Sequence, residues 1–452
     1  MIVEQSSLTQ SLSQIIAQIQ LTLSSQNQSE LLTLLKQLQT KILVEKTISI
    51  SLNEFNFIFK LIEDSPQYTS DILETILLII YGLTFSSTIE EFENFLQQSL
   101  LLTQLNGLLY NCQEYSLDFI DLLFLILENI ARKSSACLNH LLQNNFLIII
   151  KWMLETIEIQ QSEKCIISLL GFLSVFVDQN FNKQYKDLHL IMLNINKLCK
   201  ILLKINYFSI DELLNDSENL EKHEIKINLI SKLLIVLKYY TDKLQQQANI
   251  YEFKHAWKVI LFINFSDCQL AIFQKITAYI ISIQTQNNEF SIQYIVKQNK
   301  QIFENLITSF NKQNNRSGDI EKIRMHTANT FRNIFQHLDQ ANIAIYEQNL
   351  IELIEKEQQS QILSIFLECL YILTQKLPNL KYLQLIETKL QFCYECQCWQ
   401  SLKYLMLTIA LISQKDEMNS IKESKIGYYI ELLSQSGSKQ IQSLACKLLE
   451  QM

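Results

Sequence analysis

Glycine and proline are scarce in this sequence. Its 452 residues include only 6 glycines and 2 prolines, and neither type occurs between Gly171 and Gly318. Tight turns and phosphate-binding loops depend on these residues. A Rossmann sheet, a barrel or a sandwich requires many such turns. The scarcity therefore predicts an all-α protein.

The chain also has no excess of basic residues and no run of apolar residues long enough to span a membrane. The formal net charge is −8, which disfavours a general nucleic-acid binder because phosphate neutralisation requires a basic surface. The most apolar windows, "ILLIIYGL" (76–83) and "LLGFLSVFV" (169–177), are about half as long as a membrane-spanning helix. We interpret both as buried helices and expect no contact with nucleic acid or membrane.

Signals for secretion are missing as well. The first basic residue is Lys36, so the start of the chain has no charged region of a signal peptide. The 10 cysteines are far apart in a long chain, which favours reduced thiols in the cytoplasm or the nucleus.

No catalytic or metal signature is present. The sequence has no glycine-rich phosphate loop, no G-x-S-x-G elbow and no histidine pair with metal-ligand spacing. The segment "CYECQCW" (Cys393–Trp399) has C-x-x-C spacing, but a structural zinc site needs four ligands and no second pair follows. Ordinary half-buried thiols are the favoured interpretation, and a metal or redox site is the alternative. We expect no cofactor and no enzyme activity.

Apolar residues at three- and four-residue spacing dominate the rest of the chain, as in "LLTLLKQLQTKIL" (31–43), and this spacing is typical of amphipathic helices. A polar turn and two helices form a unit of about 40 residues, the period of armadillo and HEAT repeats. The pattern predicts a right-handed α-solenoid of roughly ten such repeats. The expected organisation is a short lead over 1–28 and a solenoid over 29–452, with an acidic insertion near 209–224 and a flexible loop near 311–319.

One repeat, "LLFLILENIARKSSACLNHLLQNNFLIIIKWML" (122–154), resembles an armadillo repeat of importin-α, the nuclear import adaptor. Segments 71–92, 323–355, 366–375 and 425–452 resemble other repeats of that family in the same order. The resemblance spans nearly the whole array and is faint over about 180–260. It implies a groove that holds an extended peptide by main-chain hydrogen bonds from Asn, slots between Trp rings, and acids that pair with lysines.

The resemblance assigns the peptide-binding groove to Asn129, Asn333, Glu368, Tyr371 and Gln375. Few of the family's lysine-binding residues are present. Leu125 stands four residues before Asn129, where the family has Trp, and Lys133 stands four residues after it, where an acid is expected. Two alternatives stay open. Asn129 is equally explained as a solvated helix end, and the three late residues as a polar stripe of a structural repeat.

Residues 1–35 contain no Lys or Arg, whereas importin-α begins with a basic segment that binds importin-β. We therefore expect attachment to importin-β by that route to be absent. The function implied is a protein-binding solenoid that takes extended peptides, with nuclear cargo adaptor as its finer form. The alternative is a structural scaffold subunit of a large cytoskeletal or ciliary assembly.

Overall fold

The computed structural model describes most of the chain. The described residues are 11–25, 27–44, 52–64, 67–86, 101–111, 115–134, 163–179, 185–205, 207–208, 220–244, 253–265, 271–287, 292, 300–312, 318–338, 340–413, 421–422 and 424–451. They form nineteen α-helices and one 3-10 helix, and contain no strand. The prediction of an all-α fold is confirmed. The chain divides into two compact units, Met1–Lys243 and Leu244–Met452, hereafter unit 1 and unit 2.

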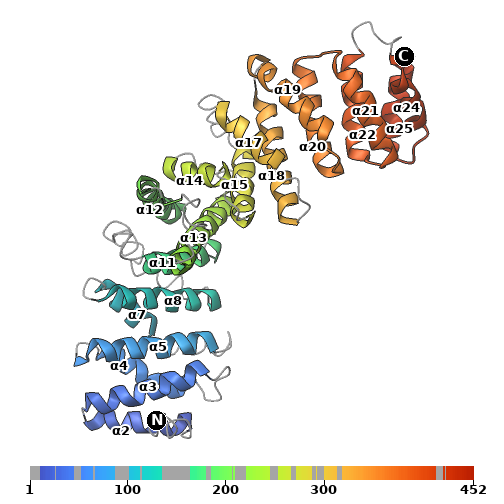
Figure 1. The fold of residues 1–452 in the computed structure, drawn as a ribbon. Helices are drawn as coiled ribbons and strands as arrows, with labels where there is room; N and C mark the ends of the chain where they lie inside the picture. Colours follow the sequence, from blue (N-terminus) through green and yellow to red (C-terminus); the bar gives the residue numbers. More distant parts are fainter. Residues whose placement is uncertain are drawn as a thin grey trace. The chain divides into compact units, whose positions relative to one another are not determined.

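Unit 1 is a stack of helices in which α3, α5, α8 and α11 pack against one another in chain order (Figure 1). Helix α2 packs on α3, α4 on α5, and α7 on α8. The described helices of this unit are α2 (Leu12–Ser25), α3 (Gln28–Val44), η1 (Leu52–Phe55), α4 (Asn56–Glu63), α5 (Ser70–Ser86), α7 (Leu101–Tyr110), α8 (Leu117–Lys133), α11 (Glu163–Gln179), α12 (Tyr185–Lys204) and α13 (Leu220–Leu244).

Unit 2 is built from five helical pairs: α14 with α15, α17 with α18, α19 with α20, α21 with α22, and α24 with α25. The second helices of the pairs pack in succession, and we call α15, α18, α20, α22 and α25 the second-helix row (Figure 1). The bounds are α14 (Lys254–Phe265), α15 (Ala271–Asn287), α17 (Lys300–Lys312), α18 (Gly318–His337), α19 (Gln340–Lys356), α20 (Ser360–Lys376), α21 (Tyr382–Glu395), α22 (Trp399–Ile412), α24 (Lys425–Ser434) and α25 (Lys439–Gln451).

Helix α8 illustrates why these segments form stacked helices. It begins at a cap where Ser116 Oγ accepts a hydrogen bond of 3.2 Å from the Phe119 backbone amide. Arg132 and Lys133 occupy its last turn, where positive charge is favourable. Ten of its seventeen residues are buried, so a single helix could not be stable alone. Packing of both flanks against neighbouring helices supplies the stability.

The expected lead and the two expected insertions fall partly outside the described residues. Within 1–28, α2 packs on α3 with Ile15 and Ile19 fully buried. Residues 209–219, most of the acidic segment, and residues 313–317, the centre of the expected loop, are not described. The division at residue 28 and the two insertions therefore stay predictions, as does the number of repeats.

Candidate peptide-binding face

The solvent side of α20 carries three of the five predicted residues. The partly exposed side chains of this helix include Gln361, Ser364, Glu368, Tyr371 and Gln375, which recur every three or four residues and so lie on one face. The other flanks are filled by apolar residues that are buried against neighbouring helices. The expectation that Glu368, Tyr371 and Gln375 share a helix face therefore holds in the structure.

Gln375 positions the first tyrosine ring of this face. Its Nε2 atom donates a hydrogen bond of 2.8 Å to the hydroxyl oxygen of Tyr371, one helical turn earlier. A tyrosine has only two side-chain torsions, so one such bond fixes the ring with little further loss of entropy. The side chain of Gln375 is exposed, and the bond to Tyr371 uses one of the two N–H groups of its amide.

Glu368 positions a second ring, which comes from the next helix of the row. The Tyr404 hydroxyl on α22 donates a hydrogen bond to the Glu368 carboxylate. Burial raises the pKa of Tyr404, and the adjacent carboxylate raises it further. On the other side, Arg332 NH1 on α18 lies 3.7 Å from Glu368 Oε2. The carboxylate therefore bridges α18, α20 and α22.

The two rings form a pair on the surface. The centroids of Tyr371 and Tyr404 are 6.2 Å apart, and the ring planes are inclined by 40°. The Nζ atom of Lys403 lies 5.7 Å from the centroid of the Tyr404 ring. We call the set Arg332, Glu368, Tyr371, Gln375, Lys403 and Tyr404 the tyrosine face. All six side chains are partly or fully exposed.

Asn333 is placed differently from the late triad. Its side chain is only 3% exposed. The Nδ2 atom donates to the Ser282 carbonyl at 3.1 Å and to Thr285 Oγ1 at 3.2 Å, both on α15. Both amide hydrogens are therefore used inside the row, and a peptide-binding role for Asn333 stays a prediction.

Asn129 lies in unit 1, on α8, and is half-buried. Its Nδ2 atom lies 3.3 Å from Thr84 Oγ1 on α5, to which it donates a hydrogen bond. Both asparagines singled out by the sequence thus join one helix of a stack to the preceding one. Asn129 belongs to unit 1, whereas the other four predicted residues belong to unit 2.

Sequence reasoning missed Arg332, Lys403 and Tyr404. They lie on α18 and α22, which pack against α20, and only this packing brings Arg332 and Tyr404 beside Glu368. The segment "WQSLKYLMLTIAL" (399–411) has no Asn four residues after an aromatic residue, so the family pattern gave no signal there.

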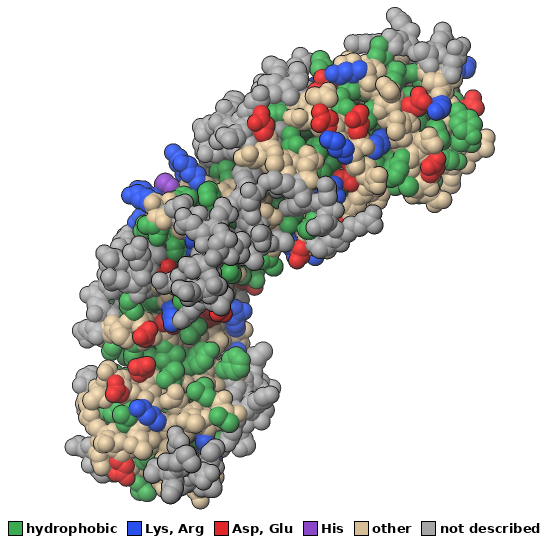
Figure 2. All heavy atoms as spheres, in the orientation of Figure 1, with side chains coloured by type: hydrophobic (Ala, Val, Ile, Leu, Met, Phe, Trp, Pro, Cys, Tyr) green, Lys and Arg blue, Asp and Glu red, His purple; other side chains and the backbone are tan. Residues whose placement is uncertain are grey.

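Charges of both signs are interspersed over the visible surface of unit 2 (Figure 2). Two hollows are also found in this unit. One, of about 430 Å³, is lined by Phe310, Asn311, Arg324, Leu353, Lys356 and Glu357. The other, of about 360 Å³, is lined by Ile351, Glu355, Lys381, Tyr382, Gln384, Leu385, Thr388 and Lys389. No residue of the tyrosine face lines either hollow.

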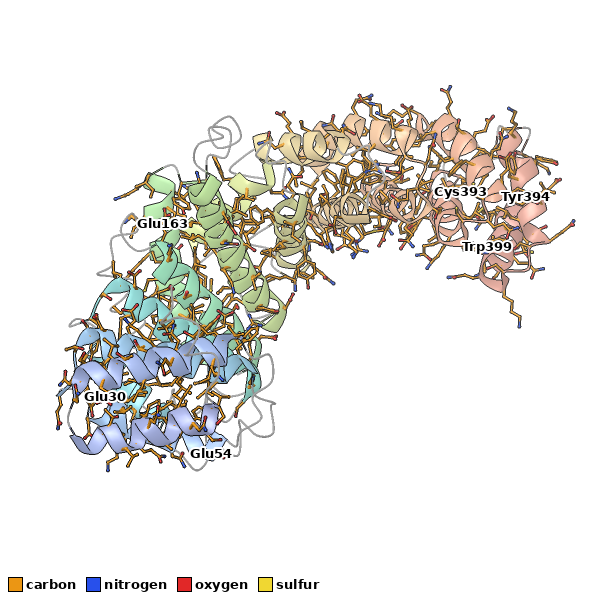
Figure 3. All side chains as sticks on the ribbon, turned by 60° about the horizontal axis from the view of Figure 1, so that its bottom comes forward. Glu30, Glu54, Glu163, Cys393, Tyr394 and Trp399 are labelled. Atoms are coloured by element: carbon orange, nitrogen blue, oxygen red, sulfur yellow. The ribbon has the colours of Figure 1, made fainter. Side chains whose placement is uncertain are left out.

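The thiol-rich segment connects α21 to α22 (Figure 3). Cys393 is buried, and burial raises the pKa of its thiol to about 12. Gln397 adopts a left-handed conformation (φ 55°), and the Cys398 amide donates to the Cys393 carbonyl at 2.9 Å, which closes the turn. Within the described parts of the chain, no group of three or more His, Cys, Asp or Glu side chains could hold a metal ion.

The same described parts contain no helix that is both long enough and apolar enough to cross a membrane.

The packing of successive helical pairs defines an α-solenoid of the armadillo and HEAT type. No protein-family model matches the sequence, and no curated protein matches it. Solved structures do match. An engineered protein superposes with a TM-score of 0.62 at 11% identity, over 97% of this chain and 98% of that chain.

Two natural solenoids are also similar. A chain from a structure reported for a phosphorylation switch in the interaction between cadherin and β-catenin gives a TM-score of 0.52 at 10% identity, over 93% of this chain and 90% of that chain. Kap121p gives a TM-score of 0.42 at 11% identity, over 97% of this chain and 45% of its own. At 10–11% identity, the likeness to the engineered protein and to the chain from the cadherin and β-catenin structure shows the fold alone.

Proposed function

We propose that the chain is a non-enzymatic protein-binding solenoid that holds an extended segment of a partner protein on the second-helix row of unit 2. The observation that carries the proposal is the arrangement of the tyrosine face. Gln375 and Glu368 each contact the hydroxyl of one ring of the Tyr371–Tyr404 pair, and both tyrosines are partly exposed. Binding to a preorganised aromatic surface avoids much of the entropic cost of ordering side chains.

The exposed amides of this row support the same proposal. Gln336, Gln361, Gln375 and Gln400 are exposed on α18, α20 and α22. An amide side chain offers both a donor and an acceptor, so it can bind the backbone of an extended segment without selecting a particular side chain. The aromatic pair then supplies the apolar contact.

Nuclear cargo adaptor is the finer form of this function, as the importin-α resemblance implies. It requires carboxylates that are available to lysines. In the tyrosine face the carboxylate of Glu368 is already engaged by Arg332 and Tyr404. A lysine-rich segment must therefore displace Arg332, and this displacement costs part of the gain from the new ion pair.

Selection from a random dodecapeptide display library tests the general proposal. The full chain serves as bait, and the enriched peptides are measured against Tyr371→Ala and against Tyr428→Ala, a control on α24 whose side chain is 58% exposed. We expect peptides whose affinity falls about tenfold with Tyr371→Ala and is unchanged with the control. If no enriched peptide depends on Tyr371, the proposed function is wrong and the scaffold alternative gains support.

Titration with a lysine-rich localisation peptide tests the adaptor form. Micromolar binding that disappears in Glu368→Lys would support it. Flat curves for the wild type and the variant would exclude it, while leaving the display result to decide the general function.

A further inference from the structure

We infer that the tyrosine face takes a proline-rich segment in the polyproline II conformation with an acidic residue beside the prolines. This inference rests on the proposed function and specifies its ligand. It combines two observations: a fixed pair of tyrosine rings and an excess of positive charge around them.

The ring pair suits proline for a geometric reason. Tyr371 and Tyr404 come from adjacent helices, with centroids 6.2 Å apart and planes inclined by 40°, and both are partly exposed, so together they form a small aromatic patch on the surface. Polyproline II helices have no internal hydrogen bonds and expose flat pyrrolidine rings, which dock in aromatic-lined grooves. The low flexibility of such a segment also reduces the entropy lost on binding.

The polar groups of the face suit the backbone of the same segment. Every carbonyl of a polyproline II helix is free to accept a hydrogen bond, whereas prolines offer no donor. Gln375 uses one N–H on Tyr371 and keeps the other. Gln400 is exposed one turn before Tyr404. Its side chain donates a hydrogen bond to the Tyr404 hydroxyl, so each of these two amides supports one ring and has a second N–H to offer.

The charges decide against a basic ligand. Arg332 and Lys403 are cationic, and Glu368 is the one carboxylate of the face. Arg332 already pairs with Glu368. Among the residues that the structure describes, no carboxylate lies within ion-pair distance of Lys403. A lysine on the ligand would therefore meet net repulsion, whereas an aspartate or glutamate would pair with Lys403.

The aromatic surface leads to the same preference. The ammonium of Lys403 already lies 5.7 Å from the Tyr404 ring centroid, within the range of a cation–π contact. A second cation at that ring would compete with it and be repelled by it. A neutral proline ring meets neither cost.

Fluorescence anisotropy with the full chain tests the inference. The probes are three labelled decapeptides: a proline-rich peptide with one Asp, the same peptide with Lys for Asp, and the Asp peptide with alanine for every proline. They are titrated against the wild type, Tyr404→Ala, Lys403→Glu and the control Tyr428→Ala. Circular dichroism melts establish that each variant is folded.

We expect the Asp-containing proline peptide to bind at least about tenfold more tightly than either of the others. Tyr404→Ala should weaken it about tenfold, and Tyr428→Ala should not. Lys403→Glu should reverse the preference, so that the Lys peptide binds better than the Asp peptide. This reversal distinguishes a direct charge contact from loss of folding.

Two outcomes overturn the inference. Equal binding of the proline and alanine peptides would show that the ring pair does not select proline. An unchanged Asp preference in Lys403→Glu would show that Lys403 does not face the ligand. In either case the display selection can still yield Tyr371-dependent peptides of another composition, so the proposed function fails or survives separately.

Discussion

Asn333 on α18 donates a hydrogen bond of 3.2 Å to Thr285 on α15, and Asn129 on α8 repeats this bond to Thr84 on α5 at 3.3 Å. The register is the same in both stacks. Each Asn stands four residues before the end of its helix, and each Thr stands two residues before the end of the preceding one. The internal repeat therefore preserves a polar bond between neighbouring helices.

Removal of the buried amide should weaken unit 2. Asn333→Ala loses two hydrogen bonds and leaves a small cavity, so we expect the free energy of unfolding to fall by about 2 kcal/mol. Urea denaturation followed by circular dichroism measures the change. Asn329→Ala, one turn earlier and only half-buried, is the matched control and should cost less than about 0.5 kcal/mol. Equal costs would contradict a specific role for the Asn333 bonds.

Even the replacement of Gly171 by alanine, which adds one methyl group, should destabilise the fold. A Cβ atom there would clash with Glu128 Oε2, and that carboxylate is held by Arg132 at 2.6 Å and Lys232 at 3.0 Å. We expect Gly171→Ala to destabilise unit 1 by about 1–2 kcal/mol, since overpacking displaces a fixed ion pair.

Two further variants control this result. Gly107→Ala, in α7 with no atom within 4 Å of the new Cβ, should instead stabilise by up to about 1 kcal/mol. In a double-mutant cycle with Glu128→Ala the penalty at Gly171 should largely vanish. A penalty that persists would place the clash elsewhere.

Arg324 should contribute more than an ordinary surface cation. Its NH2 atom lies 2.7 Å from Glu357 Oε2, and the Glu357 side chain is only 3% exposed. Arg324→Met leaves a buried carboxylate without its cation, which costs about 3 kcal/mol. Lys356→Met removes a surface pair with Glu352 at 3.7 Å and should cost less than about 1 kcal/mol. Similar melting temperatures for the two variants would refute the distinction.

The stability of unit 2 should fall on acidification because His326 is partly buried in the folded protein. Its pKa is lowered, first by burial and then by the nearby cations Lys275 and Lys322. The unfolded chain therefore takes up a proton more readily, below about pH 6.5. The stability contributed by neutral His326 is present above that pH and falls as the pH decreases. His326→Gln should reduce the difference in melting temperature between pH 7.5 and pH 5.5, with His337→Gln as the control. An unchanged difference would contradict the effect.

The cysteines of the 393–399 segment should differ in their rates of reaction with a thiol reagent. Cys393 is buried with its pKa raised to about 12, whereas Cys396 is exposed. Brief treatment of the folded protein with iodoacetamide at pH 8, followed by peptide mass spectrometry, should modify Cys396 well before Cys393. Cys446, exposed on α25, should react like Cys396. Early modification of Cys393 would show that the turn opens and would favour the redox alternative.

The helical content can be predicted from the sequence because its causes are local. Apolar residues at three- and four-residue spacing and the lack of Gly and Pro are enough to predict long amphipathic helices. The shared face of Glu368, Tyr371 and Gln375 is predictable for the same reason, since the three residues lie on one helix. Their partners are not predictable, because Arg332 and Tyr404 belong to other helices and no local spacing relates them to Glu368.

The sequence by itself determined an all-α repeat protein and one polar stripe on α20, since periodicity within a helix fixes which side chains share a face. Only the tertiary structure decided which side chains of other helices they contact. Stacking buried Asn333 against α15 and placed Arg332 and Tyr404 beside Glu368. Contacts between helices depend on how the faces pack, and that packing is a property of the whole stack.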